Sequence, residues 1–380
     1  MIAKTLFGLE ELVAQELEEI GAKDIVILNR AIAFSGNKRI MYMANYHLRT
    51  AIKILKPIEQ FKARDEHDLY REVQKIDWEE YLDNDKTFAI NATISGDYFN
   101  HSMYVALKTK DAIVDQFRDK TGERPSIDTE EPDLRISVHI SDTLCTISLD
   151  STGTQMGKRG YKTKQVFAPL SEVLGAGLVK LSGWDQKTQF IDPMCGSGTI
   201  PIEAAMIAYN IAPGKFRHFA FQYWDDFDDE LYSKIKKEAT EQEKTEGPII
   251  YCWDKDPKAN SITHDNAVRA GVRDYLEIKK QNLLDTEEFG EPAHIIMNPP
   301  YGERLDEDED MNELYGELGT HLKHKYNGSD AWIISANLRA LKFIGLRTSK
   351  KIKVFNGPLE CRFNKYELYK GSRKAAKMES

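Results

Sequence analysis

The sequence predicts an α/β chain in two parts, an N-terminal α+β module followed by a C-terminal domain with a mostly parallel sheet and helices on both faces. Two observations predict this division. Beyond residue 167, short apolar runs typical of strands alternate with amphipathic runs typical of helices, which is the pattern of a doubly wound parallel sheet. Before residue 155 the order of helices and strands is mixed, and a basic connector punctuated by glycines follows.

The N-terminal part is interpreted as two modules, residues 1–60 and 61–155. Apolar residues recur at helical spacing from Leu9 to Ile20, and apolar alternation beyond them indicates strands. The expected elements are, in order, helix 9–20, strands 24–28 and 31–34, helix 38–50, strand 52–55, helical stretch 69–82, strand 87–94, helix 104–120, and strands 134–140 and 144–149.

Residues 156–170 are interpreted as a basic linker, and residues 171–380 as the C-terminal domain. A polar, helix-like stretch over 209–248 interrupts the alternation there and is interpreted as an insertion. The expected elements of the domain are strands 189–192, 249–253, 276–279, 293–297 and 330–335, with helices 200–208, 259–270 and 313–325.

The composition indicates a globular protein of the cytoplasm, with 41% hydrophobic and 30% charged residues. No apolar run reaches the roughly 18 residues of a membrane-spanning helix, and the N-terminus does not read as a signal peptide. The four cysteines stand singly without CxxC spacing, and the nine histidines show no ligand spacing, so no metal is expected. Neither a membrane nor an obligate protein partner is predicted.

The formal net charge of −9 disfavours a nucleic-acid partner only weakly, because binding depends on where the charge lies. Acidic residues gather in two runs, 225–230 and 306–310. Basic residues gather at 350–353, near the C-terminus and in the linker. The basic residues of the linker are expected to contact phosphates, and they are Lys158, Arg159, Lys162 and Lys164. A solvated linker without such contacts is nearly as good an interpretation.

The first chemical signal is the run from Phe190 to Thr199, in which an apolar strand ends in Asp192 and a glycine-rich turn leads into a helix. Glycines let a backbone turn tightly and approach a ligand. The acidic group would repel a phosphate and instead suits a cationic ligand, the amino group and sulfonium of S-adenosylmethionine. The alternative is an ordinary strand–turn–helix connection. The candidate cofactor residues in this turn are Asp192, Cys195, Gly196, Gly198 and Thr199.

Two weaker signals follow the next two strands. Asp254 ends the second strand, where a carboxylate typically binds ribose hydroxyls, although it serves equally well as a helix cap. Asn282 and Asp285 follow the third strand, and either side chain is a candidate for contact with an adenine amino group. An ordinary turn explains these two residues as well.

The strongest signal is Asn298-Pro299-Pro300-Tyr301, directly after an apolar strand. Each proline removes an amide donor, which makes the pair a poor choice for an ordinary turn and a good one for fixing a carbonyl direction. Asn298 Oδ1 and the Pro299 carbonyl can accept hydrogen bonds from one NH2 group and aim its lone pair at a methyl donor. Tyr301 is expected to stack on an extruded base. Positioning then carries the catalysis, without a metal or covalent intermediate.

These motifs resemble those of the THUMP-domain RNA methyltransferases, and are most similar to the RlmL type, which makes N2-methylguanosine in large-subunit ribosomal RNA. The resemblance lies in residues 192–205, 298–305, 160–170 and in the insertion with Trp224. It implies a ferredoxin-like segment over 1–60, a THUMP domain over 61–155 and a Rossmann-like methyltransferase domain.

The resemblance also implies roles for the motif residues. Asp192, Gly196 and Gly198 would hold the methionine end of the cofactor, with Cys195 as a packing residue rather than a nucleophile. Asp254 would hold the ribose and Asn282 the adenine, while Asn298 and the residues after it would hold the target base. Arg304 belongs to the family signature and would pair with a phosphate or form a salt bridge.

The residues alone leave the target open. Guanine N2, adenine N6, cytosine N4 and a protein glutamine amide all present an NH2 group to such a loop. A DNA adenine methyltransferase, a glutamine methyltransferase and a non-catalytic RNA-binding protein are therefore alternatives. The N-terminal module favours RNA, with ribosomal RNA expected and tRNA as the second possibility.

Overall fold

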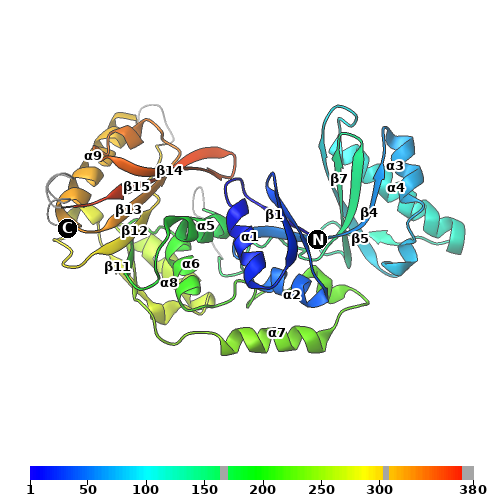
Figure 1. Cartoon of the computed structure of the whole chain (residues 1–380), viewed down its shortest axis with the longest axis horizontal. Helices are drawn as coiled ribbons and strands as arrows, with labels where there is room; N and C mark the ends of the chain where they lie inside the picture. Colours follow the sequence, from blue (N-terminus) through cyan, green and yellow to red (C-terminus); the bar gives the residue numbers. More distant parts are fainter. Residues whose placement is uncertain (163–169, 303–307, 370–380) are drawn as a thin grey trace.

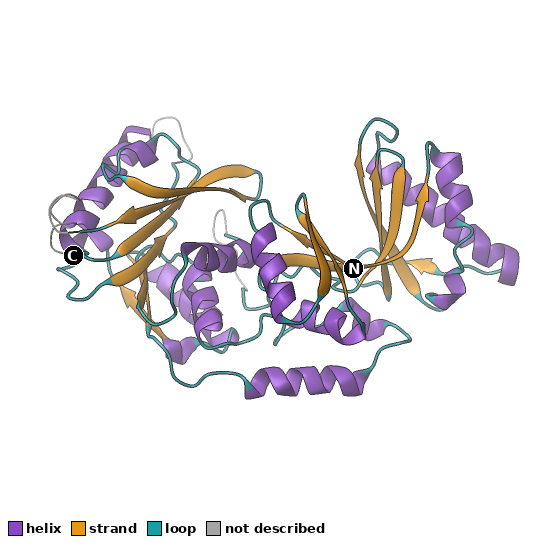
Figure 2. Cartoon of the chain, in the orientation of Figure 1, coloured by secondary structure: helices purple, strands orange, loops and turns teal. Residues whose placement is uncertain are grey.

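The computed structural model describes residues 1–162, 170–302 and 308–369, which form two sheets with helices packed against them (Figures 1 and 2). The α/β class and the two-part arrangement predicted from the sequence are confirmed. Among the described residues, no helix has both the length and the apolar character needed to cross a membrane.

The N-terminal sheet has eight strands in the order β2-β3-β1-β4-β8-β7-β5-β6. Its strands are β1 (Ile2–Thr5), β2 (Lys23–Leu28), β3 (Ala31–Ser35), β4 (Ala51–Lys62), β5 (Thr87–Ser95), β6 (Ser126–Ile127), β7 (Leu134–Ser141) and β8 (Leu144–Asp150). Its helices are α1 (Glu10–Glu19), α2 (Lys38–His47), α3 (Glu66–Val73) and α4 (Ser102–Thr121), with a 3₁₀ turn η1 (Trp78–Glu80).

The long strand β4 joins the two N-terminal modules into one sheet. Its first half pairs with β1, and from Leu55 onward it pairs with β8 as far as Lys62. The module boundary that we placed after residue 60 therefore falls inside a continuous strand. A backbone in a sheet must keep its ladder of hydrogen bonds, so the two modules cannot pivot about this point without breaking the sheet.

The helical stretch expected over residues 69–82 is shorter in the structure. The side chain of Asp65 caps the start of α3 by accepting hydrogen bonds from the backbone N–H groups of His67 and Asp68. At the other end, Gln116 Nε2 of α4 donates to the Gln74 carbonyl at 2.8 Å and to a second carbonyl two residues later. These long-range hydrogen bonds end the helix, and the local sequence pattern could not reveal them.

The C-terminal sheet has seven strands in the order β11-β10-β9-β12-β13-β15-β14. Its strands are β9 (Gln189–Asp192), β10 (Ile250–Asp254), β11 (Leu276–Lys280), β12 (Ala293–Met297), β13 (Asp330–Ser335), β14 (Thr348–Asn356) and β15 (Leu359–Glu367). Its helices are α5 (Glu172–Ser182), α6 (Thr199–Ala208), α7 (Asp229–Glu241), α8 (Pro257–Arg269) and α9 (Asp308–Lys325), with 3₁₀ turns η2 (Ala220–Tyr223), η3 (Arg273–Tyr275), η4 (Leu283–Asp285) and η6 (Ala340–Lys342).

The strands β9 to β13 are parallel to one another, as the alternating pattern predicts. The antiparallel hairpin β14–β15, which we did not predict, extends the sheet beyond β13. Its tip reaches the N-terminal part, where the rings of Phe7 and Phe355 meet edge to face with centroids 5.5 Å apart.

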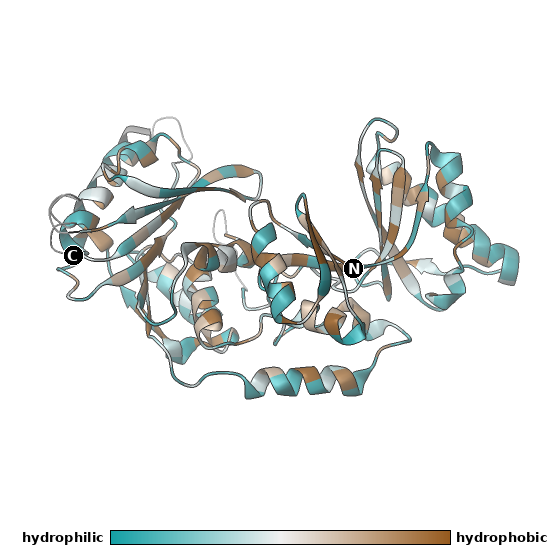
Figure 3. Ribbon diagram, viewed as in Figure 1, coloured by the Kyte–Doolittle hydropathy of each residue, from teal (hydrophilic) through white to brown (hydrophobic). Residues whose placement is uncertain are grey.

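The insertion at residues 209–248 packs on the N-terminal part of the chain. Phe221 of η2 stacks on Tyr42 of α2 with ring centroids 4.3 Å apart, and both side chains are fully buried. The helix α7, along the lower edge of Figure 1, carries apolar and charged residues along its length (Figure 3) and forms an ion pair with α2 between Glu238 and Arg39. The insertion thus completes the N-terminal core.

A buried polar network joins the two parts of the chain. Glu203 of α6 is fully buried and accepts hydrogen bonds from Arg159 and, at 3.1 Å, from the Tyr161 hydroxyl. Arg159 Nη2 also donates to the Arg49 carbonyl at 2.6 Å, and the Arg49 side chain donates to the Ile211 carbonyl at 2.9 Å. Buried charge is tolerated only when it is paired and hydrogen-bonded, so this network fixes how the two parts meet.

Candidate active site

The carboxyl ends of β9, β10 and β12 meet at one edge of the C-terminal sheet. Asp192 is the last residue of β9, Asp254 is the last residue of β10, and Asn298 directly follows β12. The strand order reverses between β9 and β12, and ligands of open α/β sheets bind outside the carboxyl ends at such a reversal. The fold therefore brings the three main candidate residues to the place where a ligand is expected.

The glycine turn after β9 is held in place by the neighbouring strand. Cys195 N donates to the Trp253 carbonyl at 3.0 Å, and Gly196 N donates to Asp254 Oδ2 at 3.0 Å. Gly198 has a φ of +80°, and a Cβ atom there would lie 2.7 Å from Thr263 Cγ2. A larger residue at this position would be strained and would also clash with α8, so the turn requires glycine here.

Side chains of α8 fasten the same turn from the other side. Thr263 Oγ1 donates to the Gly196 carbonyl at 2.9 Å, and Asn266 Nδ2 donates to the Ser197 carbonyl at 2.9 Å. Sequence reasoning missed both residues, because polar residues within a helix usually face solvent. Their spacing of three positions, which places them on one helix face, is the signal that could have revealed them.

The two carboxylates of this edge lie close enough to influence each other. Asp192 is 1% exposed, and burial is the largest cause that raises its pKa. The nearby carboxylate of Asp254 raises the pKa further, while a hydrogen bond from Met194 N to Asp192 Oδ1 lowers it. Among the described groups that shift the pKa of Asp192 there is no cation. A positively charged ligand is the partner that this arrangement favours.

Asp254 keeps acceptor capacity for a ligand as well. Its Oδ2 accepts from Gly196 N and its Oδ1 accepts from Asp256 N at 2.9 Å, which uses one hydrogen bond on each oxygen. A carboxylate accepts about four hydrogen bonds, so two sites remain for hydroxyl groups. The residues of this edge therefore fit a ligand with a cationic end and a ribose.

The candidate adenine contacts are engaged with each other. Asn282 Oδ1 accepts a long hydrogen bond of 3.4 Å from Leu284 N, and its Nδ2 donates to Asp285 Oδ2 at 3.2 Å. These hydrogen bonds build the turn η4, which agrees with the turn interpretation and leaves the adenine contact as a prediction.

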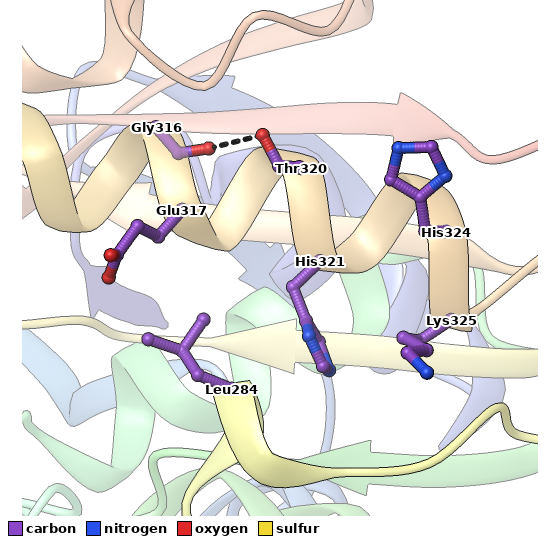
Figure 4. A pocket seen from close by; sticks show the side chains of 7 residues that line it. All are labelled: Leu284, Gly316, Glu317, Thr320, His321, His324 and Lys325. Carbon is purple, nitrogen blue, oxygen red and sulfur yellow. Dashed lines mark hydrogen bonds between the residues drawn. The ribbon is translucent and has the colours of Figure 1, made fainter.

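A groove of about 550 Å³ lies beside η4, between this turn and α9. Its lining residues are Leu284, Gly316, Glu317, Thr320, His321, His324 and Lys325 (Figure 4). The groove does not include the carboxylates of β9 and β10 or the loop after β12. Within the described ranges there is no group of His, Cys, Asp and Glu side chains arranged to hold a metal ion.

Two side chains donate hydrogen bonds to the loop after β12. Tyr315 OH of α9 donates to the Pro300 carbonyl at 3.2 Å, and Asn337 Nδ2 donates to the Tyr301 carbonyl at 2.8 Å. Tyr315 also shares a hydrogen bond of 2.7 Å with Ser335 Oγ at the end of β13. Sequence reasoning missed these three supports. A polar residue at the carboxyl end of β13 was the available signal, because β9 and β10 also end in a polar residue.

Tyr301, which was predicted to stack on the target base, makes contacts within the protein. Its hydroxyl donates to Asn298 Oδ1 at 2.6 Å, and its ring packs against the core of the C-terminal domain. Burial raises the pKa of Tyr301, so the hydroxyl stays protonated and remains a donor. An amide oxygen accepts two hydrogen bonds, so one position on Asn298 Oδ1 remains for a target amine. Stacking of Tyr301 on a base stays a prediction.

Two of the residues predicted to contact RNA have partners inside the protein in the structure. Arg159 is 2% exposed and is paired with Glu203, because the buried carboxylate needs a cation beside it. Lys162 turns inward as well, with its Nζ donating to the Leu170 carbonyl at 2.6 Å and lying 3.5 Å from Glu172.

The other three predicted RNA contacts stay predictions. Lys158 is exposed, whereas Lys164 and Arg304 lie outside the described residues.

Three models of known protein families match successive parts of the chain. A model of the RMKL-like methyltransferase domain matches residues 159–365, a model of the THUMP domain matches residues 63–150, and a model of the RlmL ferredoxin-like domain matches residues 1–55. Among solved structures, SMU.472, a methyltransferase candidate complexed with SAH, is 30% identical with a TM-score of 0.87 and covers 98% of both chains.

Two curated proteins are similar over nearly the whole chain. The RNA methyltransferase candidate slr0064 of Synechocystis is 39% identical over 367 residues, which is 95% of each chain. The ribosomal RNA large subunit methyltransferase K/L of Syntrophotalea carbinolica is 36% identical over 95% of this chain and 52% of its own length. The chain thus spans about half the length of this second relative.

The Rossmann-like sheet, the glycine turn beside two carboxylates and the Asn-Pro-Pro-Tyr loop define a class I methyltransferase domain, here behind a ferredoxin-like segment and a THUMP domain. With the matches above, the chain belongs to the RMKL-like methyltransferase family and is a THUMP-domain RNA methyltransferase of the RlmL type.

Proposed function

We propose that the chain transfers a methyl group from S-adenosylmethionine to the N2 amine of a guanosine in large-subunit ribosomal RNA. The observation that carries this proposal is the Asn-Pro-Pro-Tyr loop, fixed at the carboxyl edge of the sheet beside the acidic cofactor candidates. The choice of ribosomal RNA is supported by the similarity to the ribosomal RNA large subunit methyltransferase K/L, and that of the cofactor by the SAH-bound neighbour. The choice of guanine rests on the resemblance of the sequence motifs to the RlmL type.

The proposed cofactor site consists of the glycine turn and the acids around it. Asp192 would face the cationic end of S-adenosylmethionine, and Asp254 its ribose hydroxyls. Gly196 and Gly198 let the backbone approach the ligand, with Cys195 and Thr199 in the same turn. When bound, S-adenosylmethionine supplies an electrophilic methyl group.

The protein's part in the reaction is to orient the amine. Asn298 Oδ1 and the Pro299 carbonyl would accept hydrogen bonds from the two N–H groups of the target, which leaves the nitrogen lone pair directed away from the loop. The hydrogen bonds from Tyr315 and Asn337 to the loop carbonyls limit its movement. Preorganised geometry of this kind accounts for much of the rate of enzymes that use no covalent intermediate.

The test is to incubate the protein with tritiated S-adenosylmethionine and total RNA from a strain that lacks its gene, followed by mass spectrometry of the nucleosides. We expect label as N2-methylguanosine in large-subunit ribosomal RNA. Label in tRNA would keep the chemistry and refute the ribosomal target. Label in DNA or protein with none in RNA would refute the proposal.

The variant Asn298→Ala tests the role of the loop. We expect kcat to fall by about 100-fold or more, since a preorganised hydrogen-bond partner is lost, while cofactor affinity stays within about threefold because this residue is assigned to the base. Asn327→Ala, in the turn before β13, is the matched control and should behave like the unmodified protein. Turnover of Asn298→Ala near that of the control would contradict the mechanism.

A further inference from the structure

The segment after β13 is strongly basic in an otherwise acidic chain. Residues 336–356, called here the basic strip, contain six Lys or Arg residues and no Asp or Glu, whereas the whole chain carries a net charge of −9. The six are Arg339, Lys342, Arg347, Lys350, Lys351 and Lys353. We propose that the basic strip binds the sugar-phosphate backbone of the RNA next to the target nucleotide. This inference rests on the proposed function.

The basic strip begins at the catalytic loop itself. Asn337, its second residue, donates from Nδ2 to the Tyr301 carbonyl at 2.8 Å and accepts at Oδ1 from Ala340 N at 2.8 Å. One side chain therefore joins the Asn-Pro-Pro-Tyr loop to the turn η6. This junction adjoins the loop that is proposed to hold the target base, so we place the phosphates that flank the target at the first residues of the strip.

The backbone of the strip lies directly on α9. A Cβ atom at Gly319 would lie 1.8 Å from the Ile344 carbonyl oxygen, so the helix can carry the strip at this distance only because it has glycine there. Ala340, Leu341 and Ile344 are buried and anchor the strip, with exposures of 0%, 8% and 2%. The basic side chains are thereby presented from a fixed support, which reduces the entropy lost when a ligand binds.

The outward side of the strip combines charge with apolar surface. Arg339, Lys342 and Arg347 are exposed, and Leu338 and Phe343 between them are 42% and 48% exposed. Single-stranded nucleic acids are bound by positive grooves that follow the backbone and by aromatic side chains on which bases stack. Phe343 is the candidate for such a stacking contact.

The strip then continues along the open edge of the sheet. β14 is the last strand of the C-terminal sheet, and its residues Lys350 and Lys351 are exposed. Lys350 Nζ lies 5.9 Å from the ring centroid of Trp332, and Lys353 is paired with Glu360 at 2.6 Å. Phosphates are the complementary partner for such a group of cations, and their binding releases counterions and depends strongly on salt.

The experiment compares two triple variants with the same change of charge. Lys342→Gln, Lys350→Gln and Lys351→Gln together neutralise part of the basic strip. The control neutralises three exposed lysines on and after α7, at the opposite edge of the molecule in Figure 1 from β14. These control positions are Lys234, Lys237 and Lys244.

Binding is measured with a fluorescein-labelled single-stranded RNA of 20 nucleotides at several KCl concentrations. We expect the strip variant to bind about tenfold more weakly. The slope of log K against log[KCl] is negative, and we expect its magnitude to fall by roughly 2, since each lost phosphate contact in a single strand removes ~0.7. The control variant should stay within about twofold of the unmodified protein. Equal slopes for the two triple variants would overturn the inference.

Two further measurements distinguish a phosphate contact from a loss of folding and from attraction to any anionic surface. The Lys-to-Arg version of the strip variant should recover RNA binding, whereas failure to do so with the fold intact by circular dichroism would count against a phosphate contact. Binding to phosphatidylserine vesicles but not to RNA would also overturn the inference.

Once an RNA that the protein methylates is known, the strip variant should have a higher KM for that RNA than the unmodified protein. Its kcat and its cofactor affinity should be nearly unchanged. If no RNA is methylated at all, the proposed function fails, while a strip-dependent salt slope would still support the binding surface.

Discussion

The buried network around Glu203 should be a major source of stability at the junction of the two parts. In Glu203→Gln the side chain keeps its size, and its hydrogen bond from Tyr161 OH can persist, but its charge is lost. The guanidinium of Arg159, 2% exposed and 3.4 Å from the carboxylate, then stays buried without its counter-charge. Breaking a buried ion pair by removing one partner costs about 3–5 kcal/mol.

The lower end of this range is expected here. Arg159 keeps its hydrogen bonds to the carbonyls of Met156 at 2.8 Å and Arg49 at 2.6 Å, which compensate part of the uncovered charge. We therefore expect Glu203→Gln to reduce the free energy of unfolding by about 3 kcal/mol. Because the network spans both parts, they should unfold together in the unmodified protein.

The assay is urea unfolding followed by tryptophan fluorescence and circular dichroism, with Arg159→Met and the double variant completing a double-mutant cycle. Removing both charges should cost less than the sum of the single losses by about 2 kcal/mol, since no unpaired charge then remains buried between these two residues. Glu241→Gln, on the exposed side of α7, is the control and should not change stability. A loss below about 1 kcal/mol for Glu203→Gln, or additive losses, would refute the reasoning.

Three other predictions concern stability. His294 is buried beside Ser182 Oγ, and burial lowers its pKa from 6.5 to about 4, so the unfolded chain binds the extra proton as pH falls below 6.5. The stability that this group contributes is present above pH 6.5 and is lost towards pH 4, by about 2 kcal/mol at pH 5. The urea midpoints at pH 8 and pH 5 should therefore differ less in His294→Gln than in the unmodified protein. An equal difference in the two proteins would contradict the assignment. Gly319→Ala should cost about 1–3 kcal/mol by pushing Ile344 away, whereas Gly316→Ala, with its nearest atom at 3.6 Å, should be neutral or stabilise α9 by up to ~1 kcal/mol. Similar melting temperatures for the two glycine variants would show that the strip is not seated on α9 as described. Phe221→Ala should cost about 3–5 kcal/mol through the N-terminal core, although this residue belongs to the insertion, and an unchanged urea midpoint would contradict that packing.

The sequence predicted the parts of the site that follow from chain order. Asp192, Asp254 and Asn298 were identified because each follows an apolar strand, and parallel strands bring their carboxyl ends to one edge. Arg159 could not be assigned correctly in this way. A basic residue in a glycine-rich connector has the same local pattern whether it faces solvent or a buried glutamate, and only the tertiary fold places Glu203 beside it.

The fold was likewise predictable only where the local sequence pattern determines the element. Elements with strong periodicity, such as α1 and β9, follow from local pattern, but the hairpin β14–β15 did not, since its lysine-rich first strand lacks a clear apolar alternation. The role of the insertion was also hidden. Its residues Phe221 and Tyr232 are buried against a module that precedes them by more than 150 positions, and a single sequence carries no sign of such a pairing.

The long strand β4 sets a fixed length within the N-terminal part of the molecule. Its 12 residues run through both N-terminal modules, and at about 3.3 Å per residue they span roughly 40 Å of hydrogen-bonded backbone. The insertion and the Glu203 network then fasten this sheet to the catalytic domain. The distance between the THUMP end and the catalytic edge is thus set by the fold and not by a flexible tether. Under the proposed function, we expect the target base to lie at this set distance from the RNA feature that the THUMP end binds, so lengthening an RNA helix between them should abolish modification.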